Sequence, residues 1–214
     1  MNNALFRFAA QHNLSLIVGF HKEVRAGLVK KVTEIDELLN TTKAHQERIA
    51  LLVQRDHYSK VFEEMLRCTT FLLMYAHAEE WFYHVWKTYA RTCEVPLRGS
   101  IRRFKPVLKD GLKLDLSNDE NWRCLCDAEK VRDCLLHVNG RVSLTKNPDE
   151  IRKIAHERGL ILEESLDRIH ISGDFLNEFK DAIDAIIAAT DARINTALRP
   201  NLARFSRPQA HSSR

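Results

Sequence analysis

The sequence predicts an all-α protein, a helical bundle of four to five main helices with a small irregular or hairpin insertion. Only 7 of its 214 residues are Gly and 5 are Pro, about half the usual share. Residues 28–95 contain neither residue type, whereas the tight turns of β-hairpins depend on them. This composition excludes a β-sandwich or β-barrel. Apolar residues also recur at helical spacing along much of the chain.

The N-terminal part predicts three helices. Residues 14–39 carry an apolar stripe at helical spacing, which indicates an amphipathic helix. Asn-Thr-Thr at 40–42 offers a break before a second helix over about 43–56. The third, over about 58–92, is the most apolar part of the chain and is apolar on most sides. We therefore expect it at the centre of the bundle.

The middle of the chain predicts a loop followed by a capped helix. Residues 94–116 contain two Pro and two Gly, so we expect a loop with one or two short helical turns. Ser117 and Glu120 have the spacing of a capping box, which predicts a helix running to about residue 137. Asn139 and Gly140 then supply a left-handed stop.

The insertion is expected between this helix and the last one. Residues 141–172 are mixed in character, and 141–145 and 166–171 alternate weakly, which predicts a small hairpin or arm. Ser-Gly-Asp at 172–174 precedes a final amphipathic helix.

The length fits one large domain. We expect a single helical domain over residues 1–198, in which 14–56 could alternatively form an N-terminal extension, and a disordered tail over 199–214.

Charge and cysteine content favour a reducing compartment. The net charge of +4 permits a nucleic-acid partner without requiring one. No run of 18 apolar residues is present, so we expect no membrane span and a cytoplasmic location. An odd number of cysteines in apolar helical surroundings predicts free thiols. They are Cys68, Cys93, Cys124, Cys126 and Cys134.

Several common catalytic and cofactor motifs are absent from the sequence. It contains no GxGxxG, P-loop, GxSxG or HExxH pattern. Cys124 and Cys126 are two residues apart, and on a helix their side chains point in roughly opposite directions, so they cannot share one metal ion. We therefore expect neither a metal nor a cofactor.

One polar stripe on the predicted central helix has two interpretations. His77, Glu80 and His84 share a helix face. They could line a crevice in the bundle, or Glu80 could assist at an active site. A metal would need further ligands from another helix, and no matching set is present.

The densest positive segment lies in the predicted loop. It is either a solvated loop or a surface that contacts phosphates, where each contact adds salt-dependent affinity for nucleic acid. Its members are Arg98, Arg102, Arg103, Lys105, Lys109 and Lys113.

The most informative segment is the end of the helix that stops at Asn139 and Gly140. It places Arg132, Asp133 and His137 in the last turns. Asp133 and His137 are i, i+4 neighbours, so the carboxylate could orient the imidazole. Arg132 lies about 140° around the helix from His137, so the two cannot hold one phosphate from a straight helix.

This segment resembles the HEPN domains, all-α proteins whose hallmark is Arg-x4–6-His. The resemblance rests on NWRCLCDAEKVRDCLLHVNG, with a polar residue after the arginine and an Asn-Gly stop. Two other pairs, Arg7/His12 and Arg204/His211, have the spacing but lack the polar neighbour. Members silenced by adenylylation carry a tyrosine two residues after the histidine. This chain has Asn139 there, so we do not expect that form of regulation.

The resemblance implies a metal-independent endoribonuclease, acting as a toxin or defence effector through paired domains. Under it, His137 is the general acid or base and Arg132 stabilises the phosphoryl charge, with Asp133 and Glu80 in supporting roles. The expected RNA contacts are Arg98, Arg102, Arg103, Lys105 and Asn139. The expected partners are RNA, a second copy of the chain and an antitoxin protein. The alternative is a non-catalytic helical module that binds RNA or a protein.

Overall fold

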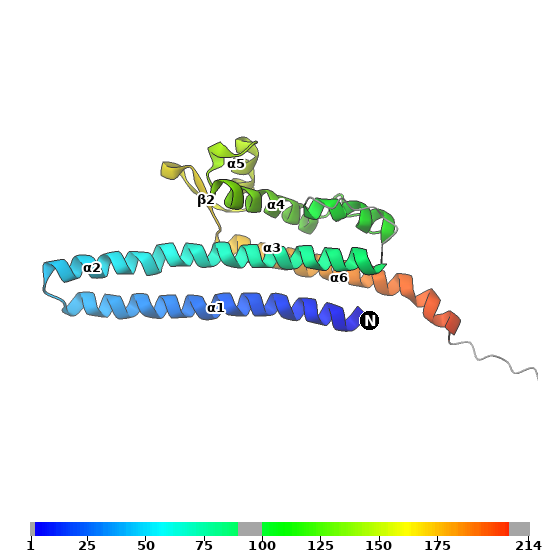
Figure 1. Ribbon diagram of the computed structural model, residues 1–214, viewed down its shortest axis with the longest axis horizontal. Helices are drawn as coiled ribbons and strands as arrows, with labels where there is room; N and C mark the ends of the chain where they lie inside the picture. The colour runs from blue at the N-terminus through cyan, green and yellow to red at the C-terminus, as the bar shows by residue number, and fades with distance from the viewer. Residues whose placement is uncertain (1–2, 90–99, 206–214) are drawn as a thin grey trace, which may run out of the picture.

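The computed structural model describes residues 3–89 and 100–205, and it is all-α as predicted. Two long helices, α1 (Asn3–Thr41) and α3 (Phe62–Tyr89), run side by side (Figure 1). Between them, α2 (His45–Asp56) continues through a π-turn (His57–Val61) into α3. The first two predicted helices and the central third one are thus confirmed, although α1 begins well before residue 14.

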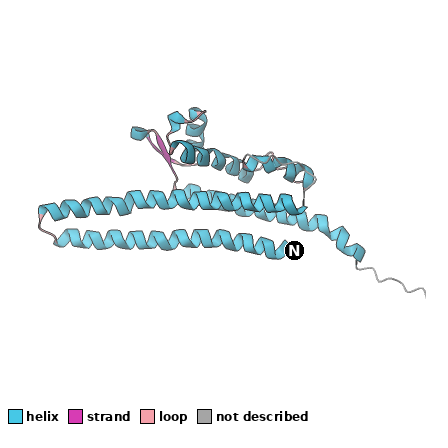
Figure 2. Ribbon diagram, in the orientation of Figure 1, coloured by secondary structure: helices cyan, strands magenta, loops and turns pink. Residues whose placement is uncertain are grey.

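A second layer covers the α3 side of this pair. The last helix, α6 (Gly173–Phe205), packs against α1 and α3, and α4 (Glu120–Val138) packs on α3 and α6 (Figure 1). Two short helical turns, Ile101–Phe104 and Val107–Gly111, precede α4 in the region predicted as a loop with such turns. Helices make up nearly all of the described chain (Figure 2).

The core lies where α3, α4 and α6 meet. Phe71 of α3 stacks near Phe179 of α6, with ring centroids 5.2 Å apart. Phe82 packs 5.8 Å from Trp122 of α4, and Trp81 Nε1 donates a 3.0 Å hydrogen bond to Thr190 Oγ1 of α6. Because α3 has neighbours on several sides, its sequence is apolar around most of its circumference.

The N-terminal helix belongs to this core, whereas α2 does not. Ala10 and Leu14 of α1 are buried in the main apolar cluster. Helix α2 contains no buried residue, so it forms the projecting end of a helical hairpin. Of the predicted extension over 14–56, α2 projects from the core, whereas Leu14 lies within it.

The start of α4 differs from the predicted capping box. Asp119 is the N-cap, and its Oδ1 accepts a 2.9 Å bond from the backbone N–H of Trp122. Ser117 instead donates to the carboxylate of Asp115 at 2.6 Å, and Glu120 is directed to Arg158. The predicted end is confirmed: Asn139 and Gly140 both have positive φ, and a Cβ at Gly140 would lie 2.9 Å from the carbonyl oxygen of Ile169.

The insertion contains a helix that the prediction missed. Helix α5 (Pro148–Glu157) begins with Pro at its first turn followed by acidic residues, which are ordinary helix-start signals. The hairpin pairs β1 (Ile161–Glu163) with β2 (Arg168–His170), so the C-terminal strand is where it was predicted. The predicted partner at 141–145 is wrong: it forms one bridge, Arg141 to Arg168, and a short 3-10 turn (Val142–Leu144).

The boundary predicted at residue 198 falls inside a helix. Helix α6 continues past Pro200 to Phe205, because a proline removes one backbone N–H without necessarily ending the helix. The rest of the predicted tail, 206–214, lies outside the described residues. Within the described ranges, none of the helices combines the length and apolar character that crossing a bilayer requires.

Candidate functional site at the end of α4

His137 lies exposed beside an open groove at the C-terminal end of α4. The groove has a volume of about 550 Å³ and runs between this helix end, the turn after it and α5. The left-handed stop directs the chain away from the helix axis directly after His137, which leaves the imidazole accessible. The lining residues include Lys130, Asp133, His137, Lys146 and Glu150.

Arg132 points away from this groove and is held on the α3 side. Its guanidinium lies 4.5 Å from the centre of the Tyr75 ring. Its Nε and Nη2 donate to Asp133 Oδ1 at 3.0 and 2.6 Å, and Nη1 lies 3.6 Å from Glu79 Oε1. As the helix geometry predicts, one copy of the chain does not direct Arg132 and His137 to a common point.

The role expected for Asp133 differs in the structure. Its carboxylate lines the groove with His137 but accepts hydrogen bonds from Arg132. Within the described residues, no hydrogen bond joins Asp133 to His137. A guanidinium offers a carboxylate two donors at once, whereas the imidazole offers one. Asp133 therefore orients Arg132 and does not hold the imidazole.

Glu79, and not Glu80, accompanies the arginine. Glu80 is exposed, and the histidines that share its face are directed to α1. His77 Nε2 lies 2.8 Å from the Ala10 carbonyl oxygen, and the ring of His84 stacks on Phe6. Among the described residues, no group of side chains is arranged to hold a metal ion.

The electrostatics around Arg132 follow from partial burial. Burial raises the pKa of Glu79, and the positive charges of Arg132 and Arg103 offset part of that rise. Burial likewise raises the pKa of the Tyr75 hydroxyl, which remains neutral beneath the guanidinium. Arg132 is thus fixed by an aromatic face and two carboxyl groups rather than extended into solvent.

The positive segment lies along the same junction of α3 and α4. Arg102 donates to the Cys126 carbonyl oxygen at 3.2 Å and lies 3.6 Å from Glu129. The guanidinium of Arg103 lies 4.8 Å from the centre of the Phe104 ring, and Lys105 is exposed. Arg98 lies outside the described residues. Arg102 therefore contacts α4 but remains exposed, Arg103 packs on its neighbour Phe104, and Lys105 is exposed.

The sequence interpretation missed Tyr75, Glu79, Lys130 and Lys146. The helical periodicity of α3 places Tyr75 and Glu79 on one face, but only tertiary packing brings that face to Arg132. Lys130 lies on α4 about two turns before His137 and forms a 2.7 Å ion pair with Glu150 of α5. Cys68, Cys124, Cys126 and Cys134 are free thiols, as predicted, and Cys93 lies outside the described residues.

Comparison of the chain with protein-family models, curated proteins and solved structures finds no match.

Proposed function

We propose that the chain is a metal-independent endoribonuclease of the HEPN type, which acts as a homodimer in a toxin or defence role in the cytoplasm. The observation that carries this proposal is the end of α4. An exposed histidine borders an open groove there, and an oriented arginine lies one and a half turns earlier. An imidazole and a guanidinium are the groups that cleavage of a phosphodiester without a metal requires.

In the proposed reaction, His137 of one copy accepts the proton of an RNA 2′-hydroxyl. The 2′-oxygen then forms a bond to the adjacent phosphorus, and the bond from phosphorus to the 5′-oxygen breaks. The leaving 5′-oxygen takes a proton from water, and the resulting hydroxide takes the proton back from His137, so that each site needs one imidazole. The products carry a 2′,3′-cyclic phosphate and a 5′-hydroxyl, and Arg132 stabilises the charge on the phosphoryl oxygens.

The divergence of Arg132 from His137 supports a site shared between two copies. Because the two side chains leave α4 in different directions, a phosphate held by Arg132 of one copy would have to meet His137 of the other. A two-fold axis near the end of α4 would form two such sites.

An exposed apolar face supports the dimer. On α1 and α3 the side chains of this face lie away from the positions that contact α6. Those positions include Arg7, which is bonded to Asp191 of α6, and Trp81, which is bonded to Thr190 of α6. Its members expose between 39% and 67% of their area, namely Leu5, Phe8, Leu16, Phe20, Phe62, Met65, Leu73 and Tyr83. Side chains of this size present roughly 800 Å², about what each partner of a standard interface buries. Glu79, which holds Arg132, is the helical neighbour of Tyr83 at the border of this face.

The test is cleavage of a panel of structured and single-stranded RNAs in the presence of excess EDTA. We expect wild-type protein to form 2′,3′-cyclic phosphate ends, and His137→Ala and Arg132→Ala each to lower the rate by about 10²-fold or more. His156→Ala is the matched control, since His156 is exposed on α5 and does not line the groove. Cleavage unchanged in His137→Ala would reject this site.

A mixing experiment tests the shared site. Arg132→Ala and His137→Ala subunits, each inactive alone, would form heterodimers with one intact site and one doubly altered site. Random exchange should restore about a quarter of wild-type activity, because half of the dimers are mixed and each has one of two sites. If Arg132 and His137 act within one chain, mixing restores nothing.

The alternative is a non-catalytic helical module, and the contacts of Arg132 favour it. An arginine stacked on Tyr75 and bonded to Asp133 is also what a purely structural role requires. This alternative predicts no cleavage by wild-type protein and RNA or protein binding that weakens when Arg102, Arg103 and Lys105 are neutralised. In the toxin setting, an antitoxin protein would act by covering the His137 groove.

A further inference from the structure

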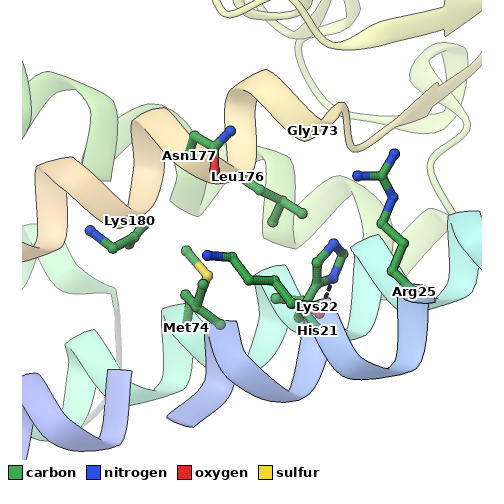
Figure 3. Close-up of a pocket in the computed structure, with 10 residues that line it drawn as sticks. His21, Lys22, Arg25, Met74, Gly173, Leu176, Asn177 and Lys180 are labelled. Atoms are coloured by element: carbon green, nitrogen blue, oxygen red, sulfur yellow. Dashed lines mark hydrogen bonds between the residues drawn. The ribbon is translucent and has the colours of Figure 1, made fainter. Parts of the chain in front are cut away.

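A second cavity lies between α1, α3 and the start of α6. Its volume is about 250 Å³, and Figure 3 shows α1 side chains reaching toward α6, with Met74 of α3 between them. It is separate from the His137 groove, because the two have no lining residue in common. Its lining residues are Val18, His21, Lys22, Arg25, Thr70, Met74, Gly173, Leu176, Asn177 and Lys180.

The charged side chains around this cavity are all basic. Lys22, Arg25 and Lys180 line it, and none of its ten lining residues is Asp or Glu. Arg25 reaches Glu63 at 3.1 Å, and Lys180 reaches both Asp181 at 3.0 Å and Asp184 at 2.8 Å, so acids outside the lining pair with these two cations. No ion pair of Lys22 occurs among the described residues. The lining therefore carries positive charge only, and Lys22 is the cation whose charge is left for a ligand.

Two neutral polar side chains of the lining, His21 and Asn177, can also form hydrogen bonds with a ligand. The Thr70 hydroxyl donates to the Leu66 carbonyl oxygen at 2.8 Å, so its oxygen accepts from His21 Nδ1 at 2.9 Å. In this tautomer the Nε2 of His21 is an acceptor, which can take a hydrogen bond from the P–OH of a singly protonated phosphate, and the Asn177 amide adds donors.

The start of α6 contributes the positive end of a helix of 33 residues. Ser172 caps this helix by accepting from the backbone N–H of Phe175 at 3.1 Å. Gly173, which has no side chain, lies in the lining and exposes the first turn to the cavity. Backbone amides at such a position bind anions well when side chains supply matching charge.

We propose that this cavity binds a phosphate group, either as the free ion or in a small phosphate monoester. Three cationic side chains, the His21 ring, the Asn177 amide and the first turn of α6 surround the space that the phosphate oxygens would occupy. Val18, Met74 and Leu176 form an apolar wall for the organic part of an ester. The volume lies below the usual range for drug-sized ligands, which restricts the occupant to a small molecule.

An NMR titration tests this site without any assay of RNA cleavage, so its outcome is independent of the proposed nuclease activity. The probes are inorganic phosphate, ribose 5-phosphate and uncharged ribose. We expect both phosphates to shift the resonances of the His21 imidazole and the Gly173 amide, with a Kd of about 1 mM or tighter, and ribose to shift neither. Tighter binding of ribose 5-phosphate than of phosphate assigns the site to an ester, and equal binding assigns it to the free ion.

Charge removal provides the matched control. Lys22→Ala and Lys180→Ala should each weaken phosphate binding about tenfold, with an unchanged circular dichroism spectrum. Lys30→Ala removes an exposed lysine from the same helix outside the cavity and should have little effect. The proposal is overturned if wild-type protein gives no shift at 20 mM phosphate. It is also overturned if Lys30→Ala weakens binding as much as Lys22→Ala does, because that result indicates diffuse surface charge.

Discussion

An arginine packs at each end of α4, and the two arginines differ in burial and in the number of their carboxylate partners. Near the start of α4, Arg158 has a side chain that is 4% exposed and is bonded to Asp127, Glu120 and Glu178. At the other end, the side chain of Arg132 is 21% exposed, rests on Tyr75 and is bonded to Asp133, which lines the open groove. Arg158 joins α4, α5 and α6, whereas the contacts of Arg132 among the described residues are with the face of α3 and with its own neighbour.

This difference indicates that Arg158 stabilises the fold, whereas Arg132 is oriented by the fold without being needed for its stability. Three carboxylates raise the pKa of Arg158 although burial opposes them, so its charge is kept and its donors are occupied. Arg132 has fewer and longer contacts, and a phosphate could replace Glu79 at 3.6 Å without disturbing the core. Variants at the two ends should therefore separate stability from activity.

The largest expected effect is on stability at Arg158. We expect Arg158→Met to lower the free energy of unfolding by about 3–5 kcal/mol, because Asp127 is left buried without its partner. Urea denaturation measures this change. Arg123→Met, which removes an exposed arginine at the same end of α4, should cost less than about 1 kcal/mol. Equal losses in the two variants would remove the distinction between the ends.

The second prediction concerns the geometry of the other arginine. Arg132→Lys keeps the positive charge but loses the paired donors to Asp133 and the flat contact with Tyr75. We expect RNA cleavage to fall about tenfold or more, and the free energy of unfolding to change by about 1 kcal/mol or less. Paired measurement of cleavage rate and urea midpoint checks this. A large loss of stability with unchanged cleavage would make Arg132 a structural residue.

The third prediction concerns the helix stop that exposes His137. Asn139 has φ of 52°, a left-handed conformation that Asn and Gly tolerate better than Ala. Asn139→Ala should lower the free energy of unfolding by about 1 kcal/mol, whereas Asn139→Gly should leave it unchanged or raise it slightly. If cleavage depends on the stop only through the position of His137, Asn139→Gly should retain it. Loss of cleavage in Asn139→Gly would instead support direct contact of the amide with RNA.

The two ends of α4 also differ in how much the sequence could predict. The stop at Asn139 and Gly140, and the divergence of Arg132 from His137, are local consequences of helix geometry and were predicted. Arg158 was not identified, because its main partner Asp127 is 31 positions away and reaches it only through the packing of α5 on α4. Similarly, the choice of Glu79 over Glu80 depends on which face of α3 meets α4. The sequence pointed to His137 rather than Arg132 as the partner of Asp133, because the side chains of consecutive helix residues rarely contact each other. The long arginine side chain makes this contact possible.

The smallest expected effect is a pH dependence at Glu79. Burial raises the pKa of this carboxyl above its ordinary value of 4.5, so the folded chain holds a proton there that the unfolded chain has released. Between these two pKa values, stability falls as pH rises and is gained as pH falls. Glu79→Gln lacks this titration. We therefore expect its free energy of unfolding, relative to wild type, to become more favourable as the pH rises from 4.5 through the raised pKa of the Glu79 carboxyl. Urea denaturation at several pH values, with Glu80→Gln as the exposed control, measures the trend. A pH-independent difference would mean that Arg132 keeps Glu79 charged as it would be in water, and that this end of α4 is as fully paired as the end at Arg158.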